Sequence, residues 1–274
     1  MAVEVVVAFL SGSLALLSDA GHMLSDVGAL AGALWAFRLA ARPATGVWTF
    51  GWARAEIVSA AGNGITLLVV AGILTVEAVR RLIDPPQVAG VPVIVVAAVG
   101  IAVNLLATTL LARANRASLN VEGAYQHVLT DLFGFAGTVV AGVVIVLTGW
   151  QRADPVATLL VVALMLRAAW GLLRDSGRVL LEAAPHGMDL DDVRRHLLDN
   201  EHVHDVHDLH VWTVTSGLPT LSAHIVVQAE CFVDDHAPRL LDELQECLVG
   251  HFDVEHSTFQ LEPLTHAEHE SALH

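Results

Sequence analysis

Long apolar runs separated by short polar loops constrain the fold of this chain more than any other feature of its sequence. The runs lie near 14–37, 57–79, 91–112, 122–147 and 155–174, and a shorter apolar segment precedes residue 12. A helix needs about 20 apolar residues to cross the hydrocarbon core of a bilayer, so each long run is a candidate span. The intervening loops contain turn signals such as 84-DPP-86. Residues 1–183 are therefore expected to form an α-helical membrane bundle.

The composition changes after residue 183, where most of the histidines and acids lie. Alternating apolar residues predict helices and strands there in the order helix, strand, strand, helix, strand. The predicted elements are 189–200, 206–214, 220–228, 234–252 and 256–262. This order indicates a small α+β domain over 184–263, ferredoxin-like, with both helices on one face of the sheet. Residues 264–274 are expected to be a disordered, histidine-containing tail.

Charge and cysteine content limit the partners and the compartment. The net charge is −15, and an acidic chain is unsuited to nucleic acid, which is bound through basic surface. Cys231 and Cys247 are the two cysteines, too few for a disulfide framework, which favours a reducing cytoplasm. The loop arginines are modestly biased towards one side of the membrane, and they predict that 184–274 is cytoplasmic.

Two of the apolar runs contain the same polar pattern. His22 and Asp26 are four residues apart in one run, and His127 and Asp131 are four apart in another. On a helix, residues at this spacing lie on one face. Ionisable residues at membrane depth are costly and are usually functional. The two pairs are predicted to meet at one level, about 15 Å into the bilayer.

Two imidazole nitrogens and two carboxylates are a suitable tetrahedral ligand set for Zn²⁺. Two carboxylates also neutralise a divalent cation, which lowers the cost of holding it in lipid. When the cation leaves, the ligands must take up protons instead, so metal and proton compete near physiological pH. The pattern therefore predicts exchange of a divalent metal for protons. Asp19 and Asn104 are possible accessory residues of this membrane site.

A second candidate metal site lies in the cytoplasmic domain. Its candidate ligands come from the two strands of the hairpin, the start of the next helix and the end of the last strand: His207, His210, His224, His236 and Glu262. A tight hairpin closing between Val214 and Thr220 would place His210 opposite His224. A longer or bulged turn would favour His207, and the pattern alone leaves both open.

Several stretches resemble the cation diffusion facilitators, in particular their zinc-exporting branch. They are 11-SGSLALLSDAGHMLSDVGALAGAL-34, 50-FGWARAEIVSAAGNG-64, 120-NVEGAYQHVLTDLFG-134, 154-DPVATLLVVALML-166, 180-LLEAAP-185 and 207-HDLHVWTVTSGLPTLSAH-224. The resemblance implies a homodimer in a bacterial inner membrane, with six membrane helices per subunit. It implies Zn²⁺ export against inward proton flow by alternating access, with Cd²⁺ and Co²⁺ as possible further substrates.

Carried onto this sequence, the resemblance implies a transport site at His22, Asp26, His127 and Asp131. In the cytoplasmic domain it implies metal ligands at His207, His224, His236 and Glu262, and so favours His207 over His210. The family's first helix is about half missing here, unless the true start lies upstream of Met1. No metal site is expected in the loop 38–52, which lacks the acid and histidines found in some relatives.

Two other classes of function compete with transport. A membrane metalloenzyme would need an open coordination position on the zinc and a general base. The sequence has no H-E-x-x-H motif, and four protein ligands would occupy all coordination positions of the zinc. The chain is therefore not expected to be an enzyme. A membrane-embedded metal sensor, or a truncated homologue that no longer transports, is the alternative reading.

Overall fold

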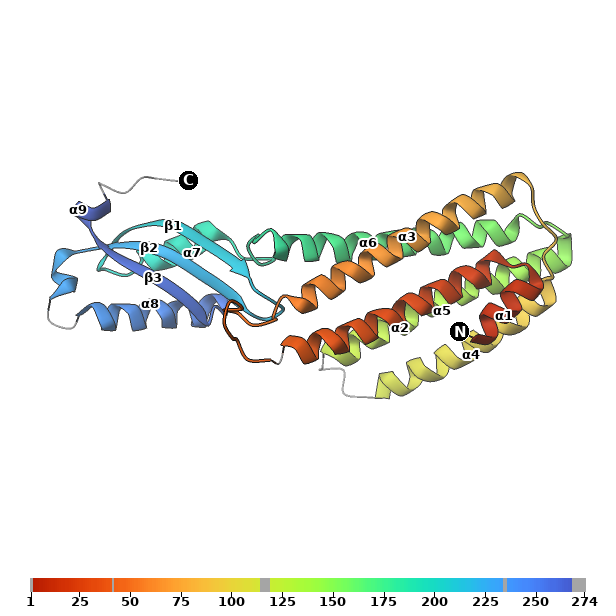
Figure 1. Cartoon of the computed structure of the whole chain (residues 1–274), viewed down its shortest axis with the longest axis horizontal. Helices are drawn as coiled ribbons and strands as arrows, with labels where there is room; N and C mark the ends of the chain where they lie inside the picture. Colours follow the sequence, from red (N-terminus) through yellow and green to blue (C-terminus); the bar gives the residue numbers. More distant parts are fainter. Residues whose placement is uncertain (1, 41, 114–118, 234–235, 268–274) are drawn as a thin grey trace. The chain divides into compact units, whose positions relative to one another are not determined.

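The structure is a computed structural model that describes residues 2–40, 42–113, 119–233 and 236–267 (Figure 1). At several positions within the first, second, fourth and fifth helices it describes the backbone alone. The chain falls into two compact units. One contains Met1–Leu34 and Ala60–Leu173, and the other contains Trp35–Ser59 and Arg174–His274.

Each apolar run of the sequence is helical, and most of the helices extend a few residues beyond the predicted limits. The helices are α1 (Ala2–Ser11), α2 (Leu14–Ala40), α3 (Ala55–Ile83), α4 (Gly90–Arg113), α5 (Leu119–Thr148) and α6 (Ala153–Leu180). Among the described residues, α3 and α6 are long and apolar enough to cross a membrane. In α4 and α5 the described apolar stretches are shorter, Gly90–Leu106 and Gly134–Thr148.

The start of α2 is the point where the other helices of the first unit meet. Leu14 belongs to a buried apolar cluster with side chains of α3 and α6, including Leu67 and Met165. Leu16 belongs to a second cluster with side chains of α4 and α5, including Val93 and Ile145. Because Leu14 and Leu16 are both fully buried, the position of α2 is fixed from two sides.

A sharp turn separates α1 from α2. Gly12 has a φ of 71°, in the left-handed region that residues with a Cβ rarely adopt. The guanidinium of Arg81 donates to the carbonyl oxygen of Gly12 at 2.5 Å, and its Nε donates to Glu77 at 3.0 Å. The turn is thus held by a side chain of α3.

The carboxylate of Asp154, at the start of α6, caps the N-terminus of α2. It accepts hydrogen bonds from the backbone N–H groups of Leu14 (2.7 Å) and Ala15 (3.3 Å) and from the hydroxyl of Ser13. Ser13 also accepts from the N–H of Leu16 at 3.3 Å. The first N–H groups of a helix have no partner within the helix, and they favour negative charge. Asp154 is fully buried, so these bonds satisfy both the carboxylate and the helix end.

The second unit contains a three-stranded mixed sheet with the predicted order of elements. They are α7 (Leu190–Leu198), β1 (Val203–Thr213), β2 (Pro219–Val227), η1 (Ala229–Phe232), α8 (His236–Phe252), β3 (His256–Pro263) and α9 (Leu264–Ala267). The sheet order is β1-β2-β3, with β1 and β2 antiparallel and β2 and β3 parallel.

One face of this sheet packs against α7 and α8. The rings of His196 in α7 and Phe252 in α8 lie 5.1 Å apart, so the two helices are neighbours. Leu240, Leu244 and Leu248 repeat every four residues along α8 and share one buried core with alternate residues of β2. Each buried leucine contributes about 1.5–3 kcal/mol to folding. The other residues of the strands face away from the helices.

We expect Asp154→Ala to lower the free energy of unfolding by about 1–3 kcal/mol, since it leaves buried donors at the start of α2 without an acceptor. The thermal midpoint of the purified protein in detergent measures the change.

Asp84→Ala is the matched control, because Asp84 is an exposed acid in the loop after α3. Its midpoint should stay close to that of the unchanged protein. Equal midpoints for the two variants would contradict a capping role for Asp154.

Candidate metal centres

The two His-x-x-x-Asp pairs of the sequence lie on α2 and α5. His22 and Asp26 are in α2, and His127 and Asp131 are in α5. At these four positions, and at Asp19 in α2, the side chains lie outside the described part of the structure, and only the helical backbone is described. Each pair has the four-residue spacing that places both members on one helix face.

The backbone gives both pairs a similar depth in the first unit. Leu16 near the start of α2 and Ala141 near the end of α5 belong to the same buried cluster. Asp26 follows Leu16 by ten residues, and Asp131 precedes Ala141 by ten residues. At about 1.5 Å per residue, each aspartate is about 15 Å along its helix from that cluster. In Figure 1 the axes of α2 and α5 are roughly aligned, and the two helices run in opposite directions.

Asn104 of α4 is level with Asp131. The helices α4 and α5 are antiparallel neighbours, with Val93 near the start of α4 and Ile145 near the end of α5 in one cluster. Further along, a Cβ at Gly100 would collide with the ring of Phe135. One helical turn beyond this contact brings α4 to Asn104 and α5 to Asp131.

In the second unit, three predicted ligands lie together on the face of the sheet that points away from α7 and α8. They are His207 of β1, His224 of β2 and Glu262 of β3, whose candidate ligand atoms all lie within 4.8 Å of one another. His207 Nε2 is 3.4 Å from Glu262 Oε2, and His224 Nδ1 is 2.9 Å from Glu262 Oε1. The two imidazole rings lie 5.1 Å apart.

The surroundings of Glu262 are suited to a bound cation. Its carboxylate is 1% exposed, and Oε1 accepts from the side chain of Gln260 at 2.6 Å. Oε2 has no hydrogen-bond partner among the described residues. A buried carboxylate oxygen without a hydrogen bond is costly, whereas a metal ion between Glu262, His207 and His224 would use it. These residues thus fit a divalent cation.

A β-bulge decides which histidine faces His224. The hairpin closes with Val214 donating to the carbonyl oxygen of Leu218, and its register pairs His210 with Ser222. The register then shifts between His207 and His210, so that His207 lies opposite His224. Asp208, within the bulge, has a φ of 48°. The tight-hairpin register, which would pair His210 with His224, is not the observed one.

His210 is oriented by the same bulge. Its Nε2 lies 3.0 Å from Asp208 Oδ1, and Asp208 Oδ2 lies 3.7 Å from His224 Nε2. Among the described residues, the His207–His224–Glu262 group therefore does not include His210.

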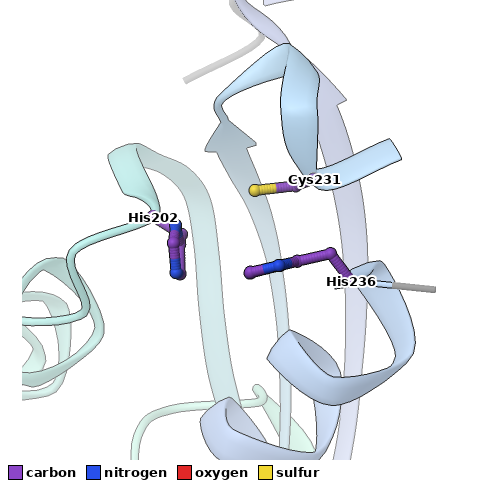
Figure 2. Close-up of side chains that lie close together, drawn as sticks. All are labelled: His202, Cys231 and His236. Carbon is purple, nitrogen blue, oxygen red and sulfur yellow. The ribbon is translucent and has the colours of Figure 1, made fainter. Parts of the chain in front are cut away.

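His236 also lies outside that group, in contrast to the sequence-based expectation. It forms a separate group with His202 and Cys231, again with ligand atoms within 4.8 Å of one another (Figure 2). His202 and Cys231 are not among the metal ligands predicted from the sequence. The spacing of Cys231 and His236 across a predicted helix start was an available signal, but pairing either with His202 requires the observed fold.

The chain matches two families, one after the other. The family described as the cation efflux transmembrane domain matches residues 1–181, and that described as the cytoplasmic domain of cation efflux proteins matches residues 185–264.

Similar proteins are known from several bacteria. The zinc transporter ZitB of Escherichia coli is 42% identical over 264 residues, which cover 96% of this chain and 83% of that protein. The cadmium, cobalt and zinc/H(+)-K(+) antiporter of Bacillus subtilis is 38% identical over 275 residues, which cover 100% of this chain and 88% of that protein. The metal cation efflux system protein CzcD of Cupriavidus metallidurans is 39% identical over 271 residues, which cover 99% of this chain and 85% of that protein.

Both families match in the expected order, and identities of 38–42% extend along almost the whole chain. The chain therefore belongs to the cation efflux family, also called the cation diffusion facilitators.

Proposed function

We propose that this protein exports Zn²⁺ from the cytoplasm in exchange for protons, by alternating access of one site within the membrane. The proposed ligands are His22 and Asp26 of α2 with His127 and Asp131 of α5. The observation that carries the proposal is the spacing of the two pairs, each with its aspartate ten residues from the cluster that contains Leu16 and Ala141. The names of the relatives agree with transport of zinc, cadmium and cobalt.

The ligand chemistry explains why metal and protons would move in opposite directions. A divalent cation must lose its hydration shell to cross lipid, and two imidazoles with two carboxylates would replace that shell. The occupied site is close to neutral because two Asp charges cancel the dication. Once the metal has left, the carboxylates and imidazoles are stabilised by binding protons, since bare charge at this depth is costly. Proton uptake on one side thus favours metal release there.

The fixed start of α2 supports an exchange of this kind. Two apolar clusters and the Asp154 cap hold this end of the helix, so Asp26 is carried on a well-anchored element. Asn104, level with Asp131, is the proposed accessory group, whose amide would orient the carboxylate or accept a hydrogen bond from its protonated form. Asp19 is the second proposed accessory residue.

As a cation efflux protein, the chain is an integral membrane protein with a cytoplasmic C-terminal domain. We place it in a bacterial inner membrane as a homodimer with six membrane helices per subunit. The proposed domain boundary lies between 183 and 184, followed by a ferredoxin-like domain to residue 263. The tail 264–274 is proposed to attract metal without forming a defined site.

The His207–His224–Glu262 group is proposed to sense cytoplasmic metal. Occupancy by Zn²⁺, with Cd²⁺ and Co²⁺ as alternatives, would join all three strands of the sheet through one ion. A sensor of this kind would make transport depend on the cytoplasmic metal level. The buried oxygen of Glu262, which has no hydrogen-bond partner among the described residues, is the observation that favours it.

We expect Asp131→Asn to reduce zinc uptake into reconstituted vesicles with an acidic lumen by about 100-fold, as for loss of a metal ligand. Removing the carboxylate leaves the dication incompletely neutralised, while the side-chain volume is kept. The initial rate of zinc accumulation under the imposed pH gradient measures the effect.

Asp84→Asn, in the exposed loop after α3, is the control and should transport at the normal rate. Folding of each variant is checked by its elution as a single dispersed species in detergent. Normal flux through a well-folded Asp131→Asn protein would refute the membrane site.

The cytoplasmic site gives a second test. We expect His207→Gln to weaken zinc binding at this group by about 10- to 100-fold, because one of three protein ligands is lost. At a zinc concentration 100 times the dissociation constant, binding stabilises the unchanged domain by about 2.7 kcal/mol, which raises its thermal midpoint. The zinc-dependent shift of that midpoint in the full chain is the measurement.

His210→Gln is the matched control on the same strand. Since His210 faces Asp208 and not the His207–His224–Glu262 group, its zinc-dependent shift should match that of the unchanged protein. A shift lost in His210→Gln but kept in His207→Gln would show that the bulged register does not select the ligand.

A further inference from the structure

Three metal-ligating side chains outside the sites described above converge at one end of the sheet. His202 immediately precedes β1, Cys231 lies in η1 after β2, and His236 is the first residue of α8. Figure 2 shows the Cys231 sulfur and the two imidazoles turned towards a common space. Cys231 and His236 are close in sequence, whereas the approach of His202 to both of them is a product of the fold.

The group is compact. The rings of His202 and His236 have centroids 4.3 Å apart and planes inclined at 80°. One ligand atom from each residue lies within 4.8 Å of those of the other two. In a tetrahedral zinc site with bonds of about 2.0–2.3 Å, ligand atoms are about 3.3–3.8 Å apart. The three side chains would need to close by about 1 Å, which rotation of the two half-exposed imidazoles can supply.

We propose that His202, Cys231 and His236 form a second metal site of the cytoplasmic domain, for a divalent cation that prefers thiolate and imidazole, such as Zn²⁺ or Cd²⁺. This ligand set is softer than that of the His207–His224–Glu262 group, which supplies a carboxylate in place of the thiolate. The two groups share no residue.

The two groups also occupy different parts of the domain. Cys231 belongs to the buried core between the sheet and its helices, whereas His207, His224 and Glu262 lie on the opposite face. Along β1, Val203 next to His202 is four residues from His207, roughly 13 Å. Each group can therefore bind an ion without excluding an ion from the other.

Metal binding at Cys231 requires loss of a proton. Burial raises the pKa of its thiol, and the neighbouring carboxylate of Glu230 raises the pKa further. The free thiol is thus protonated at neutral pH, and the cation must displace that proton to gain a thiolate ligand.

The fourth coordination position is assigned to the carboxylate of Glu201 or to water. Glu201 Oε1 lies 3.5 Å from His202 Nε2, and its side chain is 87% exposed, so it can reorient freely. One thiolate and one carboxylate would neutralise the dication. An ion held here would connect the start of β1, η1 and the start of α8, and so couple metal binding to the ends of three elements.

Cobalt spectroscopy of the full-length protein tests the site directly. Bound to a thiolate, Co²⁺ gives a sulfur-to-metal charge-transfer band in the near ultraviolet, and imidazole or carboxylate ligands do not give one. The chain has two cysteines, Cys231 and Cys247, so such a band must come from one of them. We expect the band in the unchanged protein, its loss in Cys231→Ser, and its retention in Cys247→Ser.

Cys247 is a well-matched control. Its Sγ lies 4.0 Å from His251 Nδ1 on α8, so it too has an imidazole neighbour. It belongs to neither of the two three-residue groups found among the described residues. A band that survives in Cys231→Ser and disappears in Cys247→Ser, or no band in the unchanged protein, would overturn the proposal.

A second pair of variants keeps the test valid if Cys231→Ser fails to fold. His202→Gln and His236→Gln each leave the thiol in place and should weaken Co²⁺ binding, followed by the same band, by about 10- to 100-fold. Unaltered titrations in both variants would show that Cys231 binds without the two histidines, and the assigned site would be wrong. The readout is binding and not flux, so it is independent of the transport proposal.

Discussion

The first unit depends on one buried interaction, the hydrogen bonding of the Asp154 carboxylate to the N-terminus of α2. Within an apolar bundle, the free N–H groups at a helix start must find an acceptor, and a buried carboxylate must find donors. Each satisfies the other here, across more than a hundred residues of sequence. Leu14 and Leu16 then pack against different helix pairs immediately after the cap. The helix that carries His22 and Asp26 is thereby fixed at one end.

The backbone of the second unit brings three candidate ligands from three strands to one face of the sheet. Alternation along a strand would put His207 and His210 on opposite faces of a regular sheet, and a hairpin register fixes only one of them opposite His224. The bulge at Asp208 shifts the register between His207 and His210, so that His207 lies opposite His224. A local irregularity in β1 therefore determines the composition of the group, as β-bulges near functional sites often do.

The sequence predicts structure well where its signal is periodic. The apolar runs of the first unit and the alternating segments of the second predict the observed helices and strands to within a few residues, because burial imposes those periods directly. The strand pattern did not distinguish His207 from His210, since a bulge leaves little trace in composition, and only the family resemblance favoured His207. The spacing of residues also does not reveal that His236 lies beside His202 and Cys231, because their approach depends on how β1, η1 and α8 meet.

The two cytoplasmic groups differ in a way that bears on their roles. Glu262 brings a carboxylate to His207 and His224, so an ion there would be held by oxygen and imidazole nitrogen. Cys231 brings a thiol whose pKa is raised by burial, so an ion at its group must first remove a proton. The first group therefore offers a harder ligand set, and the second a softer one that favours cations with affinity for sulfur. The two proposed sites would thus differ in the cations that each prefers.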